Sequence, residues 1–447
     1  MKIPQNVTAK EIQIWLPCTG FLLTILTFFP SYLTPDSFDQ YEQSLLFQFN
    51  DWHPSIMAFL WSLLNAIYTG PQPMLFLQVS IFWLGVHFLL SAIPTGSFIK
   101  TAIMVALLFS PTVLNFIGVI WKDVQLAAAW SFVAAYVFAQ KQNGHEVSLK
   151  NKIWLILILI YGALIRHNAG LIAGPLVLYV ITGRSYMAYF WKTTIAYILV
   201  ASLSLGMNNA FNEALNASKS PATHSLMVFD LAGISLNIGE NQYPFALSQN
   251  QMEAMRPCYH EGYDWGGFIW GDCGFIWELS KQMGDQNRTM RKAWIDAIIN
   301  HPIAYMNHRL THFDRLLGLL SHKANGYYIW QDGISPNKIG IETRKHGLYH
   351  LVKAYVDSFS STWIFRPISW LILSLLLIFF SFFSKLEKEV SEFIFTMGIV
   401  SLFYIFTYLP FGVAADFRYI YLSIILTIYG FIVCLSQFNI IKTASRI

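Results

Sequence analysis

Long apolar runs separated by short polar segments occupy both ends of the chain. A helix needs about 20 mainly apolar residues to cross the roughly 30 Å of hydrocarbon in a bilayer, and several runs approach that length. Hydropathy and the Lys and Arg content of the short loops together predict ten membrane spans. They are residues 13–33, 73–92, 101–120, 124–140, 153–165, 171–182, 187–207, 363–383, 393–410 and 420–438.

Basic residues set the expected orientation of these spans. The loop 141–152 carries three lysines, and basic loops stay on the cytoplasmic side. Both termini are therefore expected in the cytoplasm, with the run 13–33 kept as an uncleaved first span. A further apolar helix, Ser55–Tyr68, is only about four turns long. We expect it to lie in the membrane interface rather than to cross.

Polar sequence interrupts the spans between residues 208 and 360. Its length and its near-balanced charge predict a folded, mostly helical domain outside the membrane. The chain then divides into an N-terminal transmembrane module (1–207) with its first external loop at 34–71, an external domain (208–360) and a C-terminal transmembrane module (361–447).

Two helices are predicted inside the external domain, near residues 289–300 and 302–320, with Pro302 at a favoured first-turn position. Apolar residues at 3-4 spacing indicate the buried face of the second helix. They are Ile303, Met306, Leu310, Phe313 and Leu317. His308 and His312 have metal-ligand spacing, but no acid or cysteine lies close to them in sequence. We expect them on a solvated face.

Two of the four cysteines, Cys258 and Cys273, fall in the external domain. In an oxidising compartment they are expected to form a disulfide, worth roughly 3 kcal/mol for a loop of about 15 residues, and the alternative is two free thiols. The enclosed segment 259–272 is rich in Gly, Tyr, Trp and acids. That composition suits contact with a sugar as well as ordinary aromatic packing.

Composition supports an all-α, multi-pass membrane protein. Apolar residues make up 55% of the chain, aromatic residues 16% and charged residues 12%, and the mean hydropathy is +0.45. The net charge of +4 comes from basic cytoplasmic ends and does not indicate nucleic acid. The sequence has no Walker loop, no dinucleotide-binding glycine motif and no Gly-x-Ser-x-Gly. We therefore expect the energy for any reaction to arrive within the membrane.

Charged residues gather on the predicted external side, in five separate loops that a bundle of spans would bring together. They are Asp36, Asp39, Glu42, Asp51, His53, Lys122, Asp123, Arg166, His167, Asp416 and Arg418. A carboxylate can take the proton of an attacking hydroxyl, while Arg and Lys can hold a departing phosphate. Each residue also has a simpler interpretation, because Asp is a favoured helix cap and basic residues anchor span ends at the interface.

These residues resemble the motifs of the GT-C class of membrane glycosyltransferases, such as protein O-mannosyltransferases, lipid A aminoarabinose transferases and bacterial O-antigen glucosyltransferases. The run Asp36-Ser37-Phe38-Asp39-Gln40-Tyr41-Glu42 resembles the acidic motif of their first external loop, and Asp51-Trp52-His53-Pro54 resembles the segment that follows it. Lys122-Asp123 matches the acid after the third span. Arg166 matches a basic residue after the fifth span, and Arg418-Tyr419 matches a late Arg-Tyr pair.

The resemblance implies a glycosyltransferase that uses a polyprenyl-phosphate sugar, with its site on the periplasmic face of a bacterial inner membrane. It implies catalytic roles for Asp36, Asp39 and Asp123, and leaves open whether Asp36 or Asp39 is the base. Substrate-binding roles fall to Glu42, Asp51, His53, Lys122, Arg166, His167, Arg418 and Tyr419. A divalent cation is left open, and the expected partners are the lipid-linked donor, a glycan acceptor and the membrane.

Arg166 is expected to meet the donor phosphate, since the sequence places no acid beside it. Two other functions stay open. One is an O-antigen polymerase or ligase that uses a pyrophosphate-linked glycan, and the other is a transporter without enzymatic activity.

Overall fold

The computed structural model describes residues 9–186, 189–220, 222–259, 264–282, 286–319, 333–343, 345, 347–383 and 386–444. These residues fold into helices, and apart from the helices they contain three isolated β-bridges and no strand. The all-helical fold class is therefore confirmed for the described part of the chain.

Ten α-helices precede the external domain. They are α1 (Ala9–Phe28), α2 (Pro35–Leu46), α3 (Ile56–Asn65), α4 (Gln72–Ala92), α5 (Ser97–Leu108), α6 (Pro111–Ile117), α7 (Lys122–Gln142), α8 (Leu149–Ile165), α9 (Gly174–Thr182) and α10 (Phe190–Ala214). The described residues that follow include α11 (Ala222–Ile238), α12 (Gln249–Cys258), α13 (Gly274–Lys281), α14 (Gln286–Asn300), α15 (Pro302–Leu317), α16 (Gly347–Asp357), α17 (Pro367–Phe383), α18 (Lys388–Phe411) and α19 (Tyr421–Ala444).

Four helical segments of the described chain are long and apolar enough to cross a membrane: α4, α10, α18 and residues 417–437. The pair α5 and α6 makes a fifth if it counts as one span, bent by 57° where Pro111 starts a new helix. A membrane protein with several crossings is therefore supported. The remaining predicted spans also coincide with helices, but these are shorter or less apolar.

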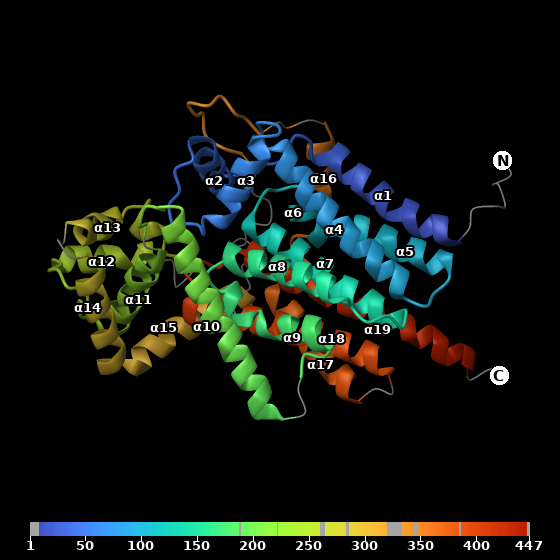
Figure 1. The fold of residues 1–447 in the computed structure, drawn as a ribbon. Helices are drawn as coiled ribbons and strands as arrows, with labels where there is room; N and C mark the ends of the chain where they lie inside the picture. Colours follow the sequence, from blue (N-terminus) through green and yellow to red (C-terminus); the bar gives the residue numbers. More distant parts are fainter. Residues whose placement is uncertain are drawn as a thin grey trace.

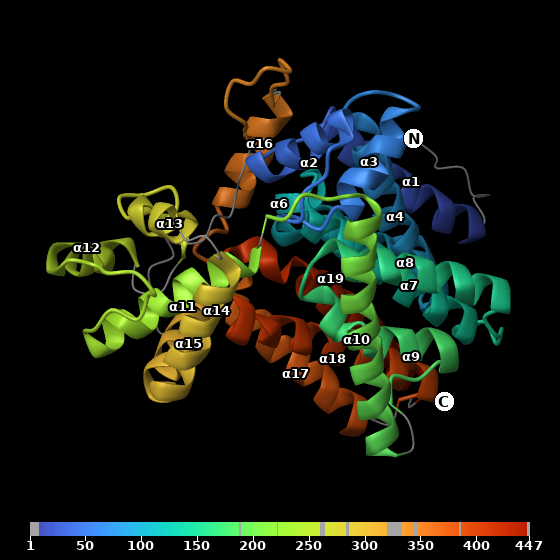
Figure 2. The same ribbon diagram turned by 60° about the vertical axis from the view of Figure 1, so that its left-hand side comes forward.

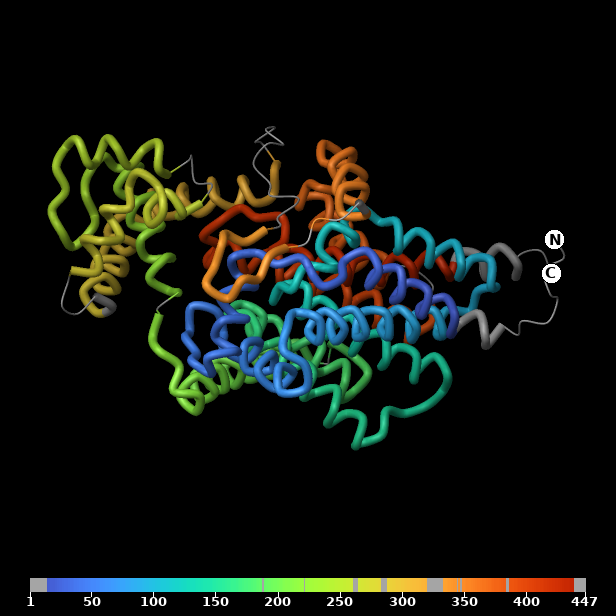
Figure 3. Tube along the Cα trace, turned by 90° about the horizontal axis from the view of Figure 1, so that it is seen from above, coloured from blue at the N-terminus to red at the C-terminus, as the bar shows by residue number. Residues whose placement is uncertain are grey.

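The helices form one bundle, with α11 to α15 as a separate unit at one end (Figure 1). The N-terminal end of α1 and the C-terminal end of α19 both lie at the opposite end of the bundle, as Figure 3 shows from a second direction. α2 and α3 lie at the same end as α11 to α15. α16, which falls within the predicted external domain, packs instead against α6 and α1.

The centre of the bundle is α7, which packs against α4, α8, α9, α18 and α19. Its alanines, including Ala127, Ala128 and Ala134, are buried and allow neighbouring helix backbones to approach closely. α10 is the opposite case. Its main helix contacts are with η1 (Ala169–Ile172), α8 and α9, it lies in the foreground of Figure 2, and it has one buried residue, Thr193. Its apolar surface therefore suits contact with lipid.

α14 and α15 confirm the two helices predicted in the external domain, and Pro302 starts α15. The predicted buried stripe is wrong over its first half, because Ile303, Met306 and Leu310 are at least half exposed. The buried face of α15 instead carries His308, Arg309 and His312. The expectation of solvated histidines is therefore also wrong.

Candidate functional site

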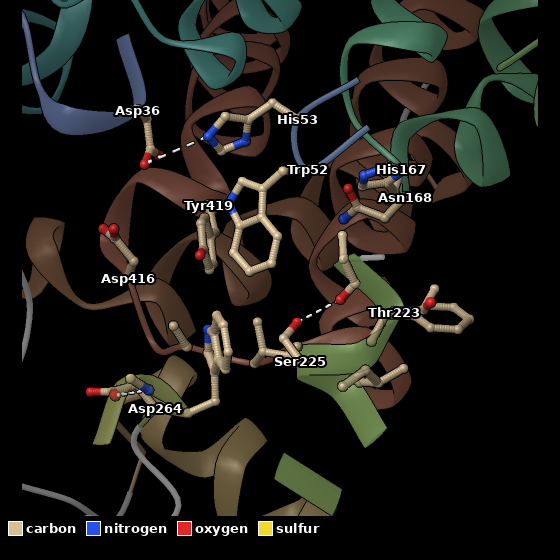
Figure 4. Close-up of a pocket in the computed structure, with 18 of the residues that line it drawn as sticks. Asp36, Trp52, His53, His167, Asn168, Thr223, Ser225, Asp264, Asp416 and Tyr419 are labelled. Atoms are coloured by element: carbon tan, nitrogen blue, oxygen red, sulfur yellow. Dashed lines mark hydrogen bonds and ion pairs between the residues drawn. The ribbon is translucent and has the colours of Figure 1, made fainter. Parts of the chain in front are cut away.

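A cavity of about 1330 Å³ lies where the bundle, the first loop and the external unit meet. It is larger than the 300–1,000 Å³ common for pockets that hold small molecules. Eight of the predicted site residues line it: Asp36, Asp51, His53, Lys122, Arg166, His167, Arg418 and Tyr419. Figure 4 shows Asp36 and His53 on one side of the cavity and Asp264 on the other. Asp39, Glu42 and Asp123 are not part of the lining.

Asp36 owes its position to the cap of α2. Thr34 and Ser37 form a capping box, and the Ser37 hydroxyl donates to the Ile120 carbonyl at 2.8 Å. Pro35 occupies the first turn, so Asp36 follows at a fixed point of the helix entry. Asp39 lies almost one turn further on, where Gln43 donates to its carboxylate at 2.7 Å. The two candidate bases therefore face different surroundings, and of the two only Asp36 opens onto the cavity.

Arg418 is held between two carboxylates. Its Nη1 donates to Asp36 Oδ2 at 2.7 Å, its Nε lies 2.7 Å from Asp416 Oδ2, and its guanidinium lies 4.5 Å from the centre of the Trp121 ring. Burial acts to raise the pKa of Asp36, but the charge and hydrogen bond of Arg418 outweigh it, Lys122 adds to their effect, and together they hold that pKa well below its usual range. Asp36 is therefore an ionised and weakly basic carboxylate in the free protein.

His53 lies between Lys122 and Asp36. The Lys122 amino group lies 2.7 Å from His53 Nδ1, and His53 Nε2 lies 3.8 Å from Asp36 Oδ1. Burial lowers the pKa of His53 to about 3, and the charge of Lys122 adds to this shift, so the ring is neutral at ordinary pH. Burial lowers the pKa of Lys122 to about 7. When its amino group is protonated, Lys122 can only donate, so Nδ1 accepts and the ring proton sits on Nε2, on the side of Asp36.

Arg166 and Asp123 form an ion pair in which both side chains are almost fully buried. This corrects the expectation that Arg166 lacks a counter-charge. The carboxylate comes from the second residue of α7 and was hidden by its sequence distance from Arg166. Asp123 therefore faces Arg166 and not the cavity, whereas Lys122, one residue earlier, opens onto the cavity. Arg166 still lines the cavity, with its guanidinium 4.8 Å from the centre of the Tyr419 ring.

Sequence reasoning did not find several parts of the wall. Tyr408 stacks on Tyr419 with ring centres 5.2 Å apart, and Asn168 donates to Thr407 at 2.8 Å. Trp52 lines the cavity beside His53. Its place between Asp51 and His53 in the sequence was a signal that could have singled it out.

Buried charge also joins the external unit to the cavity. Asp230 is fully buried, accepts from His308 Nε2 at 2.9 Å and from Trp294 Nε1 at 2.7 Å, and pairs with Arg309. Arg309 Nη1 donates to the Gly412 carbonyl at 2.6 Å, on the segment that leads to Asp416. This partner of His308 is 78 residues away, which explains why the sequence indicated a solvated face.

The predicted disulfide between Cys258 and Cys273 is confirmed. Among the described residues, no group of three His, Cys, Asp or Glu side chains converges as a metal ion would need. Burial lowers the pKa of His308, although Asp230 acts against that shift. The ring therefore serves packing and hydrogen bonding in this neighbourhood.

Comparisons of the chain with protein-family models, with curated proteins and with solved structures give no match. A function for the protein is therefore inferred from the geometry of the cavity and from the chemistry of its residues.

Proposed function

We propose that the protein is a membrane glycosyltransferase that moves a sugar from a polyprenyl-phosphate carrier to a cell-surface glycan, such as an O-antigen or another part of lipopolysaccharide. The observation that carries the proposal is the meeting of Asp36, Lys122 and Arg418 in one large cavity next to membrane-capable helices. Transfer from a phosphate needs a base for the acceptor and cations for the leaving group.

Lys122 is the best candidate for the first contact with the phosphate. It forms no ion pair within the described part of the chain and opens onto the cavity at the first position of α7. A helix N-terminus adds positive potential and unpaired backbone N–H groups at the same place. The cap residue Trp121 supplies no side-chain hydrogen bond there. Arg418 and Arg166 can add planar, two-bond contacts to phosphate oxygens.

The reaction is then a direct displacement. An acceptor hydroxyl oxygen attacks the anomeric carbon, the bond from that carbon to the phosphate oxygen breaks, and its electron pair stays on the phosphate. The hydroxyl proton passes to Asp36. His53, neutral and protonated on Nε2, keeps Asp36 and Lys122 apart and correctly placed rather than acting as the base.

Donor binding would also activate the base. Asp36 is weakly basic in the free protein because positive charges surround it. A phosphate held by Lys122 and Arg418 brings negative charge that offsets them, so it raises the pKa of Asp36 toward the range useful for proton transfer. The carboxylate would thus become an effective base only when the donor is present.

The proposal includes the ten spans, the GT-C arrangement and a cavity that opens on the periplasmic side of a bacterial inner membrane. α10 supports a lateral route for the lipid, because its exposed face is apolar while Leu205, Asn208 and Asn212 near its C-terminal end line the cavity. A polyprenyl chain could lie along that face with its phosphate in the cavity.

The test uses the full chain in lipid nanodiscs, a panel of radiolabelled undecaprenyl-phosphate hexoses, and release of undecaprenyl phosphate as the signal. Asp36→Asn is expected to lower turnover about 10²–10³-fold, the scale of one lost catalytic contact. Asp39→Asn is the matched control, since Asp39 lies on the same helix but outside the cavity. Equal activity of the two variants would reject the proposal. Turnover of pyrophosphate-linked oligosaccharides alone would indicate a polymerase or ligase. Movement of a substrate across the membrane without any turnover would indicate a transporter.

A further inference from the structure

The wall of the cavity formed by the external unit carries an aromatic surface that the proposed reaction does not use. Trp265 is buried and packs against three other indole rings, with ring centres 5.6 Å from Trp52, 5.4 Å from Trp270 and 5.6 Å from Trp277. Trp52 and Trp270 line the cavity, and Trp270 is 74% exposed. Aromatic rings that gather at the wall of a cavity are typical of a surface that a ligand covers.

Carboxylates flank these rings. Asp264 and Asp272 belong to the disulfide-closed segment and both line the cavity, as does Asp51 from the first loop. Asp264 Oδ1 accepts from the Gly266 N–H at 2.6 Å, and within the described residues its second oxygen has no hydrogen bond. An ionised carboxylate can only accept hydrogen bonds, so it selects a ligand that is rich in donors.

We infer that Trp52, Trp270, Asp264 and Asp272 form a carbohydrate-binding subsite for the acceptor. The C–H face of a sugar ring is apolar and packs on an indole ring, while its hydroxyl edge donates to carboxylates. Carbohydrate binding follows from this surface alone, whereas the role of the bound glycan as acceptor rests on the proposed function.

Charge separates this subsite from the phosphate end of the cavity. Lys122, Arg166 and Arg418 approach from the bundle, whereas Asp264 and Asp272 belong to the external unit. Like charges repel the phosphate from the acidic wall, and an uncharged glycan carries no such penalty. The basic end of the cavity would therefore bind the lipid-linked donor, and the acidic wall would bind the glycan acceptor.

The described residues of the subsite are linked to the segment that carries Arg418. The disulfide closes the segment, and Gly267 lies so close to the Cys258 carbonyl that a side chain would clash there. The Trp265 N–H donates to the Val413 carbonyl at 3.0 Å, and Asp264 pairs with Ala414 in an antiparallel bridge. Residues 413 and 414 lead directly to Asp416 and Arg418, and Arg418 contacts Asp36. An acceptor bound on this wall therefore has a defined position relative to the proposed base.

The first measurement is binding, with the full chain in nanodiscs and no lipid donor. The probe is the delipidated polysaccharide released from the cell envelope of the source bacterium, titrated by calorimetry. Trp270→Ala is expected to weaken binding at least tenfold, and Trp270→Phe to recover part of it. Trp191→Ala is the matched control, since Trp191 is 73% exposed but lies outside the cavity lining. No saturable binding by the parent, or equal binding by Trp270→Ala, would overturn the inference.

The second measurement separates this inference from the proposed function. In the donor assay, Trp270→Ala is expected to raise KM for the polysaccharide at least tenfold, whereas the control Trp191→Ala leaves both that KM and the turnover of the lipid donor unchanged. Glycan binding without any donor turnover would reject the glycosyltransferase and keep the subsite. Donor turnover with equal KM for parent and variant would keep the enzyme and reject the subsite.

Discussion

Asp36 and Arg418 are 382 residues apart in sequence, yet Arg418 Nη1 lies 2.7 Å from Asp36 Oδ2. The contact joins the start of α2 to η6 (Phe417–Ile420), the turn that precedes α19. Because Asp416 holds the Nε side of the same guanidinium, Arg418 cannot turn away without leaving a buried carboxylate unpaired. The proposed base is thus fixed by both transmembrane modules, and its basicity is set by a partner from the other end of the chain.

The pH dependence of turnover tests the proposed activation of Asp36. Protonation removes the base, so activity falls as the pH falls through the pKa of Asp36. That pKa lies well below its usual range in the free protein, and a bound phosphate is expected to raise it. Since kcat/KM reports the free enzyme and kcat the donor complex, the acidic limb of kcat should lie at higher pH than that of kcat/KM. Superimposed acidic limbs would show that the donor leaves the base unchanged.

Replacing Arg418 tests the leaving-group contact. Arg418→Gln should reduce kcat/KM for the lipid donor about 10²–10³-fold, because a cation at the departing phosphate is lost. Arg418→Lys should retain only part of the kcat/KM of the parent, since a point charge cannot make the planar two-bond contact. Arg366→Gln removes an exposed arginine outside the cavity and serves as the control. Full activity of Arg418→Lys would mean that charge alone matters.

The sequence predicted that the charged residues gather at one end of the bundle, because the ends of the predicted spans set their depth, and eight of the predicted site residues line one cavity. It could not predict which of them meet, because that depends on helix rotation. Lys122 and Asp123 are adjacent, and successive residues on a helix point about 100° apart. One therefore opens onto the cavity while the other is buried against Arg166. The disulfide was predictable because only its two cysteines lie outside the predicted spans.

The external unit shows a different limit. The apolar stripe of α15 indicated the wrong buried face over its first half, because hydropathy treats His308 and Arg309 as surface residues. Their burial is stabilised by Asp230 on α11, a partner that no local pattern reveals. Burying the Asp230 carboxylate costs less free energy than burying an unpaired carboxylate, because Arg309 supplies a counter-charge and His308 a hydrogen bond.

Arg166 and Asp123 provide a prediction about stability. Arg166→Ala leaves Asp123 buried without its counter-charge, which should lower the free energy of unfolding by about 3–5 kcal/mol. The double variant Arg166→Met with Asp123→Leu removes both charges and should recover most of that loss. Thermal unfolding in nanodiscs measures the stability of the single and the double variant. The double variant should still use the donor poorly, because Arg166 also lines the cavity. An additive loss in the double variant would contradict a paired role.

His53 predicts how stability depends on pH. Its pKa is about 3 in the folded protein, against an ordinary value near 6.5, so between these values the unfolded chain binds a proton that the folded chain does not. Stability should therefore fall as the pH drops below about 6.5, by up to about 1.4 kcal/mol per pH unit from this group. His53→Gln should flatten that dependence, whereas His145→Gln, at an exposed position, should not. Parallel curves for His53→Gln and the parent would contradict the neutral, buried ring.

Arg309 predicts communication between the external unit and the proposed active site. Its Nη1 donates to the Gly412 carbonyl, and residues 412–416 carry Asp416 to its place beside Arg418. Arg309→Lys keeps the charge next to Asp230 but cannot also reach two partners with a planar group. We expect it to fold with a modest loss of stability and to lower kcat about tenfold, with little change in the KM for the lipid donor. A positioning role predicts this division, because the segment sets the geometry of Arg418 in the transition state more than it sets initial binding.

The control for Arg309 is Arg315→Lys, on the same helix and outside the cavity lining. It should leave kcat unchanged. If Arg309→Lys lowers stability and the amount of active protein to the same extent, while kcat per folded molecule is unchanged, the residue only stabilises the external unit. If kcat falls while the unfolding temperature is preserved, the contact with Gly412 transmits the position of the external unit to Arg418. The second outcome is the one that the geometry favours, because Gly412 is buried and directly follows the end of α18.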